Sequence, residues 1–408
     1  MQTPMNNNNS RRKFLGNVAL AGLASLWPVE KAMARARGTH TTADDTYRFI
    51  TPPYLQRMTP RSVSIMWITS RNCYSWVEYG TNGQLDQHTH HETAGLIDAN
   101  DHVHRIDLVN LQPNTTYQYR VCSKEITDFH PYKLQYGATI TSETYTFKTF
   151  DDKAQSVSWL MLNDIHDRPA SFAPLLALNN NAPQDFVFLN GDMFDFQTDE
   201  QQIIDHLLTP LTQTFASQQP FFYTRGNHET RGKFARQHAG YFACPGDRYY
   251  FSFTQGPVHF VVLDTGEDKL DDHVEYSGLV AFDNYRIEQA RWLEQEINTP
   301  AFRKAKYRVV LMHIPPFNSG DAHGTLHCRE LFNPLFNKGK VDLMICGHTH
   351  KYGVWPPTDE HHYPIIIGGG PKEGNRTLIR VNANGHSLDL SMLRDDGVEV
   401  GTYNIQRS

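Results

Sequence analysis

Short apolar runs alternate with helical patterns through the second part of this chain. Five of these runs have the length of a buried strand, at residues 157–162, 186–189, 221–223, 309–312 and 341–346. Two further strands are predicted at 260–263 and 363–367, and helices at 170–178, 200–215 and 285–297. Asn333 before Pro334 predicts the start of another helix. This alternation predicts a layered α/β domain, which we place at residues 155–395.

Residues 40–150 have a different pattern, in which apolar and polar side chains alternate along short segments. Val63 and Trp67 lie on one face of such a segment, and residues 117–121 repeat the alternation after a turn at 111–116. Several short strands separated by turns favour a β-sandwich. We therefore expect two domains in a mature chain of about 370 residues.

Residues 1–36 have the pattern of an export signal. Arg11 and Arg12 precede an apolar stretch, 14–27, that is too short to span a bilayer, and residues 32–34 form a small-x-small cleavage site. The alternative is a buried first helix, which the lack of acidic residues in this stretch opposes. We expect a twin-arginine signal peptide, a periplasmic or secreted protein, and no stable membrane anchor in the mature chain.

Charge and cysteine usage exclude some classes of partner. Loss of the first 34 residues removes four basic groups and one acid, so the net charge of -6 becomes -9. An acidic chain without a basic run argues against duplex nucleic acid as a partner. The five cysteines fit no metal-finger spacing, and their odd number leaves at least one thiol free. The oligomeric state and any disulfide pairing are not predicted.

Histidines also gather in the N-terminal region, where two interpretations stay open. A second metal site is one, and a polar loop with the solvent face of a strand is the other. We favour the second, because no acid or cysteine completes a known ligand spacing. The residues are His88, His90, His91, His102 and His104.

Blocks of polar residues follow the five predicted strands. The blocks are Asp164-Ile165-His166, Gly191-Asp192-Met193-Phe194-Asp195, Gly226-Asn227-His228-Glu229, the single His313, and Gly347-His348-Thr349-His350. Any one block alone fits a helix cap or a buried core histidine. Open α/β sheets bind ligands at the carboxyl ends of their strands. Five such loops together predict one shared site.

The order of these blocks resembles the signature of the calcineurin-like metallophosphoesterases, over residues 155–370. Residues 54–67 and 111–121 are similar to the fibronectin type III-like domain that precedes the catalytic domain in purple acid phosphatases. The resemblance implies an α/β protein in which an N-terminal β-sandwich precedes a layered αββα-type catalytic domain. It also implies two metal ions, for which Fe, Zn, Mn and Mg are the candidates.

The same resemblance implies a role for each polar side chain. A pair of cations needs a bridging carboxylate and a mixed shell of imidazole and oxygen ligands, and Asp192 is expected to be the bridge. The other ligands are expected to be Asp164, His166 and His350 for the first ion, and Asn227, His313 and His348 for the second.

The implied reaction is hydrolysis of a phosphate ester. A hydroxide that bridges the metals would attack phosphorus, and His228 would protonate the leaving alkoxide as general acid. We expect Asp195 to hydrogen-bond His228 and raise its pKa, and Glu229 to assist as an acceptor. Arg231 is a candidate ligand of the phosphate, with a surface salt bridge as its alternative. His323 is a second, looser candidate for substrate binding.

One position departs from the purple acid phosphatases. Those enzymes carry Gly-Asp-x-x-Tyr, whose tyrosinate binds ferric iron and gives the colour, and they lack the histidine of Asp-x-His. Asp195 stands in place of that tyrosine here, and His166 adds an imidazole. We therefore predict a colourless or weakly coloured enzyme.

The substrate is the least determined part of the prediction. Residues 265–284 and 317–326 form long loops that are expected to shape a pocket. Our first hypothesis is an exported phosphatase acting on a small phosphomonoester. The second is a metal-dependent phosphodiesterase or nucleotide hydrolase. The third, from a different class, is a non-catalytic envelope binding protein.

Overall fold

The computed structural model describes residues 46–407, and these residues fall within one compact unit. The predicted signal segment, residues 1–36, lies outside the described residues. Among the helices of the described part, none is long and apolar enough to cross a membrane.

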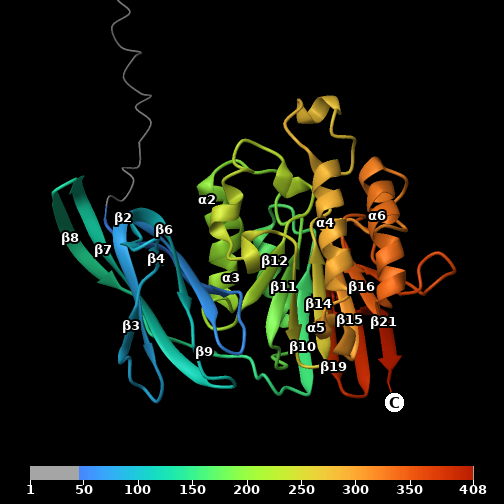
Figure 1. Ribbon diagram of the computed structural model, residues 1–408, viewed down its shortest axis with the longest axis horizontal. Helices are drawn as coiled ribbons and strands as arrows, with labels where there is room; N and C mark the ends of the chain where they lie inside the picture. The colour runs from blue at the N-terminus through green and yellow to red at the C-terminus, as the bar shows by residue number, and fades with distance from the viewer. Residues whose placement is uncertain (1–45, 408) are drawn as a thin grey trace, which may run out of the picture. The chain divides into compact units, whose positions relative to one another are not determined.

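The N-terminal region is built from strands, several of them long and bent (Figure 1). The strands are β1 (Phe49–Gln56), β2 (Val63–Gly80), β3 (Gln87–Thr89), β4 (Glu92–Thr93), β5 (Leu96–Ile97), β6 (Ala99–Leu108), β7 (Thr116–His130), β8 (Lys133–Thr141) and β9 (Tyr145–Lys148). β2 pairs with β1 and β6 along its first part and with β7 and β3 along its second. Trp67 and Tyr119 are buried on the apolar faces that the alternation predicts.

The first sheet of the C-terminal region contains three parallel strands from the start of this region and three antiparallel strands from its end. They are β10 (Ser156–Leu162), β11 (Phe186–Asn190), β12 (Phe221–Thr224), β19 (Thr377–Asn384), β20 (Ser387–Arg394) and β21 (Glu399–Gln406). β1 pairs with β12 at Gln56 and Phe221, which joins the N-terminal strands to this sheet. β21 pairs with β20, so the sheet continues beyond the predicted domain end at residue 395.

The second sheet of the C-terminal region is mostly parallel. Its strands are β13 (Phe251–Gln255), β14 (Val258–Leu263), β15 (Tyr307–Met312), β16 (Leu343–Cys346), β17 (Gly353–Trp355) and β18 (Ile365–Ile367). β14, β15, β16 and β18 run parallel, and β13 and β17 are antiparallel strands at the two edges.

Aromatic side chains pack the inner faces of the two sheets against each other. Trp159 of β10 meets Phe260 of β14 edge to face at 4.9 Å between ring centroids, and Phe222 of β12 stacks on Phe253 of β13 at 4.2 Å. Burying each such ring contributes about 1.5–3 kcal/mol to folding. The strands that carry the predicted site are therefore held in one rigid core.

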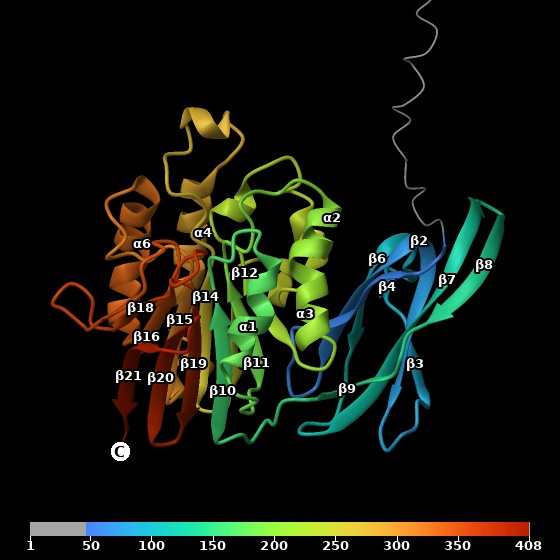
Figure 2. The same cartoon turned by 180° about the vertical axis from the view of Figure 1, so that it is seen from behind.

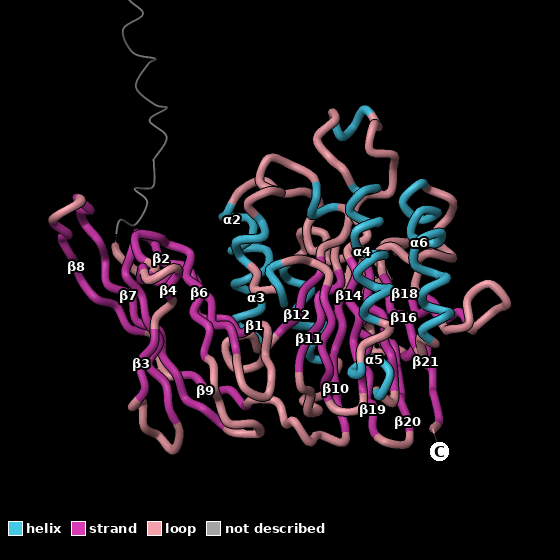
Figure 3. Tube along the Cα trace, in the orientation of Figure 1, coloured by secondary structure: helices cyan, strands magenta, loops and turns pink. Residues whose placement is uncertain are grey.

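Helices cover the outer faces of both sheets, so the layer order is helix, sheet, sheet, helix (Figures 2 and 3). α1 (Phe172–Ala177), α2 (Glu200–Ile203) and α3 (Thr209–Thr214) lie on the side of the first sheet, with a π-helical turn, Ile204–Leu208, between α2 and α3. α4 (Phe282–Glu296), α5 (Pro300–Lys304) and α6 (His323–Gly339) lie on the side of the second. The predicted fold class, a β-rich N-terminal region followed by a layered α/β region, is confirmed.

The helix predicted to begin at Asn333 and Pro334 begins earlier. α6 starts at His323, and Pro334 lies inside it. A proline removes one backbone N–H donor but does not end a helix whose apolar face is buried. Phe332 and Phe336 are fully buried against the second sheet, and this packing keeps the chain helical on both sides of the proline.

Candidate metal centre

Five loops at the carboxyl ends of parallel strands carry the predicted ligands. β10, β11 and β12 of the first sheet lead into the blocks at Asp164, Gly191 and Gly226. β15 and β16 of the second sheet lead into His313 and the block at Gly347. Because the two sheets pack face to face, these loops meet at one edge of the double layer.

The first group of side chains consists of Asp164, His166 and His350, whose ligand atoms lie within 4.8 Å of one another. His350 Nε2 is 3.2 Å from Asp164 Oδ1 and 3.0 Å from His166 Nε2. Two imidazole lone pairs at that separation repel each other unless a proton or a cation lies beside both. A transition metal with ligand distances of about 2.0–2.2 Å fits between them.

The second group consists of Asp192, His313 and His348. Asp192 Oδ2 is 2.9 Å from His313 Nε2 and 3.6 Å from His166 Nε2, so this carboxylate faces both groups. Asn227 Oδ1 lies 3.0 Å from His348 Nδ1. The structure thus brings all seven predicted ligands together, with Asp192 between the two groups.

Hydrogen bonds from neighbouring groups fix the orientation of several candidate ligands. Asp164 Oδ2 accepts from Asn163 Nδ2 at 2.6 Å and from the His348 N–H at 2.9 Å. His313 Nδ1 donates to the carbonyl of Asn190 at 2.8 Å. Among the described residues, the buried atoms Asp164 Oδ1 and His313 Nε2 make no hydrogen bond, and each faces another candidate ligand, His350 Nε2 at 3.2 Å and Asp192 Oδ2 at 2.9 Å. Imidazole nitrogens and carboxylate oxygens that face one another in this way are the donor set of a transition metal, so the residues present fit such an ion.

The electrostatics of the centre also favour cations. Burial lowers the pKa of His313, but the carboxylates of Asp192 and Asp164 outweigh burial and raise that pKa to about 10. His348 shows the opposite result, because burial and the neighbouring His313 lower its pKa to about 4. The two carboxylates therefore create a negative potential that a proton or a metal ion must balance.

Several candidate ligands have an unusual backbone conformation. Asp164, His166, Asp192, His348 and His350 have φ values of 53°, 50°, 55°, 73° and 56°. Residues with side chains rarely adopt this left-handed region, and each such residue costs of the order of 1 kcal/mol. The packed sheets below hold these conformations, which aim the side chains at one point.

Two glycines allow the loops after β11 and β12 to touch. A Cβ atom on Gly191 would lie 2.5 Å from the backbone nitrogen of Gly226, and a Cβ on Gly226 would lie 2.2 Å from Asp192 Oδ1. Gly191 also has a φ of 78°. Any other residue at either position would push apart the loops that carry Asp192 and Asn227.

Glu229 fastens the same two loops together. Its side chain is fully buried, and its carboxylate accepts from the backbone N–H groups of Asp192, Met193 and Gly226 at 2.9, 2.6 and 2.8 Å. Burial, followed by the charge of Asp192, raises the pKa of Glu229 to about 7. Its role as an acceptor therefore concerns backbone N–H groups, and this positions Asp192.

The predicted hydrogen bond from Asp195 to His228 has a different form in the structure. The carboxylate of Asp195 accepts from His166 Nδ1 at 2.8 Å, which turns His166 Nε2 toward the centre. His228 Nδ1 instead donates to the backbone carbonyl of Asp195 at 2.7 Å. Burial and the Arg231 guanidinium lower the pKa of His228, although Asp192 acts against them. The expectation of a raised His228 pKa in the free protein was therefore wrong.

Arg231 lies beside His228 and is held by an acid that the sequence did not single out. Its Nε and Nη2 donate to the two carboxylate oxygens of Glu267 at 2.8 and 2.9 Å, and its Nη1 lies 3.2 Å from His228 Nε2. Thr230 and Tyr276 also donate to Glu267. Glu267 belongs to the loop after β14, whose length was the one signal that it serves the site. Arg231 is therefore not in a solvent-exposed surface ion pair.

His323 lies apart from the predicted ligands. Its Nε2 is 2.7 Å from Asp283 Oδ1 in a separate group with His327. Its predicted role as a substrate ligand is not supported by any contact with the metal centre among the described residues.

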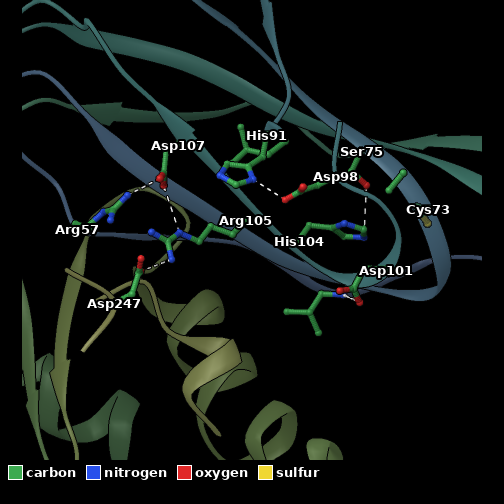
Figure 4. A pocket seen from close by; sticks show the side chains of 13 residues that line it. Arg57, Cys73, Ser75, His91, Asp98, Asp101, His104, Arg105, Asp107 and Asp247 are labelled. Carbon is green, nitrogen blue, oxygen red and sulfur yellow. Dashed lines mark hydrogen bonds and ion pairs between the residues drawn. The ribbon is translucent and has the colours of Figure 1, made fainter. Parts of the chain in front are cut away.

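A further cavity, of about 570 Å³, lies on the N-terminal strands and is lined largely by charged side chains (Figure 4). His91 pairs with Asp98 at 2.5 Å, and Arg105 pairs with Asp247 at 2.6 Å. Of the described residues that line it, none is a predicted ligand of the dinuclear centre. Four aspartates and two arginines line it, so its charge does not favour a phosphate.

Comparison with known proteins agrees with this geometry. Residues 159–352 match the family Calcineurin-like phosphoesterase, and residues 53–149 match the family Purple acid Phosphatase, N-terminal domain. The chain carries a calcineurin-like phosphoesterase domain. The part of it matched by that family includes all seven predicted ligands, His228 and Asp195.

Relatives and solved structures extend the likeness to both parts of the chain. The probable purple acid phosphatase 20 of Arabidopsis thaliana is 24% identical over 370 residues, covering 84% of this chain and 79% of its own length. Purple acid phosphatase PPD1 from yellow lupin shares the fold with a TM-score of 0.67 and 16% identity, over 87% of this chain and 74% of its own. The structure of PhoD does so with a TM-score of 0.61 and 13% identity, over 90% of each chain.

These findings confirm the predicted resemblance and the predicted enzyme class, a metal-dependent phosphoester hydrolase. They support a dinuclear centre for the family, while the identity of the metals stays open. The role of each site residue stays a prediction.

Proposed function

We propose that this phosphoesterase is an exported phosphomonoesterase with a dinuclear metal centre. The observation that carries this proposal is the convergence of seven candidate ligands around Asp192, in which the buried Asp164 Oδ1 and His313 Nε2 face other ligand atoms without making a hydrogen bond. The names of relatives support a phosphomonoester as substrate. Besides the plant purple acid phosphatases, they include a phosphoenolpyruvate phosphatase of Allium cepa, 22% identical over 360 residues.

The side chains beside the centre suit the charge changes of this reaction. Two cations bound at Asp192 would supply a nucleophile at neutral pH and would neutralise the phosphoryl oxygens. The Arg231 guanidinium, oriented by Glu267, binds a phosphoryl oxygen, and His228 Nε2 faces the leaving group. A phosphate dianion in contact with His228 raises its pKa, which provides the proton for the departing alkoxide.

Hydrolysis of two model esters tests the proposal. p-Nitrophenyl phosphate and its bis-ester are to be compared for the wild type, Asp192→Ala and His228→Ala, after metal analysis. His362→Ala, a change at an exposed histidine, is the matched control. We expect the monoester to react faster in the wild type and both reactions to fail in Asp192→Ala.

Other outcomes select other functions. Preference for the bis-ester would identify a phosphodiesterase. Equal turnover in the wild type and Asp192→Ala would show that the metal centre does not catalyse the reaction. Metal binding without any turnover of either ester would favour the non-catalytic binding protein.

Export is the part of the proposal that rests on Arg11 and Arg12. We expect Arg11→Lys with Arg12→Lys to leave folded precursor in the cytoplasm, whereas the wild type reaches the periplasm or the medium. Cell fractionation with an antibody against the mature chain measures this. Unchanged export of the double variant would contradict the twin-arginine route.

A further inference from the structure

A second group of metal-binding side chains lies between the first turns of α4 and α6. Asp283 is in the first turn of α4, and His323 and His327 are in the first two turns of α6. His323 and His327 are four residues apart, so both imidazoles lie on the same face of α6. His323 Nε2 is 2.7 Å and His327 Nδ1 is 3.1 Å from Asp283 Oδ1.

The three ligand atoms are arranged as a cation would need them. All lie within 4.8 Å of one another, and two ligands of a tetrahedral zinc ion are separated by about 3.3 Å. The contacts of Asp283 Oδ1 with His323 and His327, 2.7 and 3.1 Å, would therefore lengthen by about 0.6 and 0.2 Å to admit the ion. The His327 side chain is 14% exposed, and its buried Nδ1 makes no hydrogen bond among the described residues, although Asp283 Oδ1 lies 3.1 Å away. That atom is available as a ligand.

We propose that Asp283, His323 and His327 bind a third metal ion, zinc or another divalent transition metal. Two imidazoles and one carboxylate form the donor set of a zinc site with an open fourth position, which water would fill. Sidechain exposures of 30% for His323 and 34% for Asp283 leave a path for the ion and the water.

One cation of the chain already faces this group. Arg286 Nη1 donates to Asp283 Oδ1 at 2.9 Å, and Arg286 is fully buried, with its Nε donating to the carbonyl of Thr265 at 2.8 Å. Its guanidinium competes with a metal for the same oxygen. The two histidines are therefore the stronger ligands, and replacing them should remove most of the affinity.

The proposed ion would also fix the loop that orients Arg231. The Gly324 N–H donates to the carbonyl of Asp268 at 2.8 Å, and Arg286 Nη2 donates to the carbonyl of Glu267. Binding between α4 and α6 would hold these contacts in place. This consequence rests on the proposed function, whereas the metal site itself does not.

Metal stoichiometry tests the site. The full-length protein, stripped of metal and dialysed against zinc, is to be measured by mass spectrometry of its metal content. We expect three zinc ions in the wild type and two in the double variant His323→Ala with His327→Ala. The control variant His362→Ala with His386→Ala, which changes two exposed histidines, should keep three.

A variant with an altered dinuclear centre, Asp192→Asn, distinguishes the two sites. Asp192→Asn should keep one zinc ion. Adding His323→Ala and His327→Ala to this variant should remove that ion. Circular dichroism checks that each variant is folded. Co²⁺ bound to folded Asp192→Asn should give visible absorption that the added pair abolishes. The proposal is wrong if the wild type binds only two ions, or if the double variant keeps three. Three bound ions without phosphatase activity would contradict the proposed function and leave the third site standing.

Discussion

Asp195 shows how a single residue can serve two histidines through different atoms. Its carboxylate holds His166 in the tautomer that presents Nε2 to the centre, and its backbone carbonyl holds His228. The side chain of His228 is 26% exposed, and its Nε2 lies 4.0 Å from Asp192 Oδ2. His228 is thus fixed at the rim of the centre, where a leaving group would depart.

The proposed proton donor can be tested by varying the leaving group. Replacing His228 by alanine should slow hydrolysis of a phosphate monoester with an alkyl leaving group by about 10²–10⁴-fold. A p-nitrophenolate leaving group needs little protonation, so the same change should slow that substrate much less. kcat for both esters measures the difference. Equal losses for both would show that His228 positions the substrate and does not protonate it.

The colour of the iron-loaded protein tests the substitution at position 195. The seven candidate ligands include no tyrosine, so we expect the wild type loaded with ferric iron to lack an intense tyrosinate band in its visible spectrum. Asp195→Tyr restores the purple acid phosphatase motif and serves as the positive control. Strong visible absorption in the wild type would contradict this ligand set.

At the scale of the elements, the loops after β11 and β12 behave as one unit. Gly191 and Gly226 allow their close approach, and Glu229 binds backbone N–H groups on both loops. The loop after β14 adds Glu267, which anchors Arg231 beside His228. The site is therefore set by contacts between loops more than within them.

Loss of the Glu229 carboxylate should weaken this unit. Glu229→Gln leaves buried N–H donors facing an amide, which should lower the free energy of unfolding by about 3 kcal/mol. Urea unfolding without added metal measures the change. Glu373→Gln, at an exposed position, should leave stability unchanged. A loss no larger than in this control would show that Glu229 does not fasten the loops.

At the scale of the whole molecule, buried uncharged histidines stabilise both regions. His104 lies among the N-terminal strands, with its Nε2 2.9 Å from Thr69 Oγ1. His238 lies in the phosphoesterase domain, with its Nδ1 2.9 Å from the Tyr249 hydroxyl. Burial lowers the pKa of each to about 3, against an ordinary value of 6.5.

These shifts predict a loss of stability in acid. The unfolded chain binds protons at both histidines below pH 6.5, while the folded chain does so only near pH 3. Stability is therefore fully present above pH 6.5 and falls by about 1.4 kcal/mol per pH unit for each histidine between these values. Urea unfolding at pH 5.5 and 4.5 should show a decrease about 2–3 kcal/mol larger in the wild type than in His104→Gln with His238→Gln. Equal decreases would mean that these histidines are protonated in the folded state.

The sequence by itself determined the layers and the location of the chemistry. Apolar runs of strand length bounded by turn residues favour buried strands, and polar blocks such as Gly191 to Asp195 follow them at the strand ends, so their shared edge could be predicted. Pro334 misled the helix prediction because local preference cannot weigh the burial of Phe332 and Phe336.

Only the tertiary structure decided which atoms meet. Asp195 offers two acceptors, its carboxylate and its backbone carbonyl. The carboxylate bonds His166 because neighbouring loops hold His166 at a positive φ angle. Glu267 reaches Arg231, and Asp283 reaches His323, across gaps in the sequence that no local pattern connects. Hydrogen bonds and metal ligation act over about 3 Å, so their partners are fixed only when the packed sheets bring the loops together.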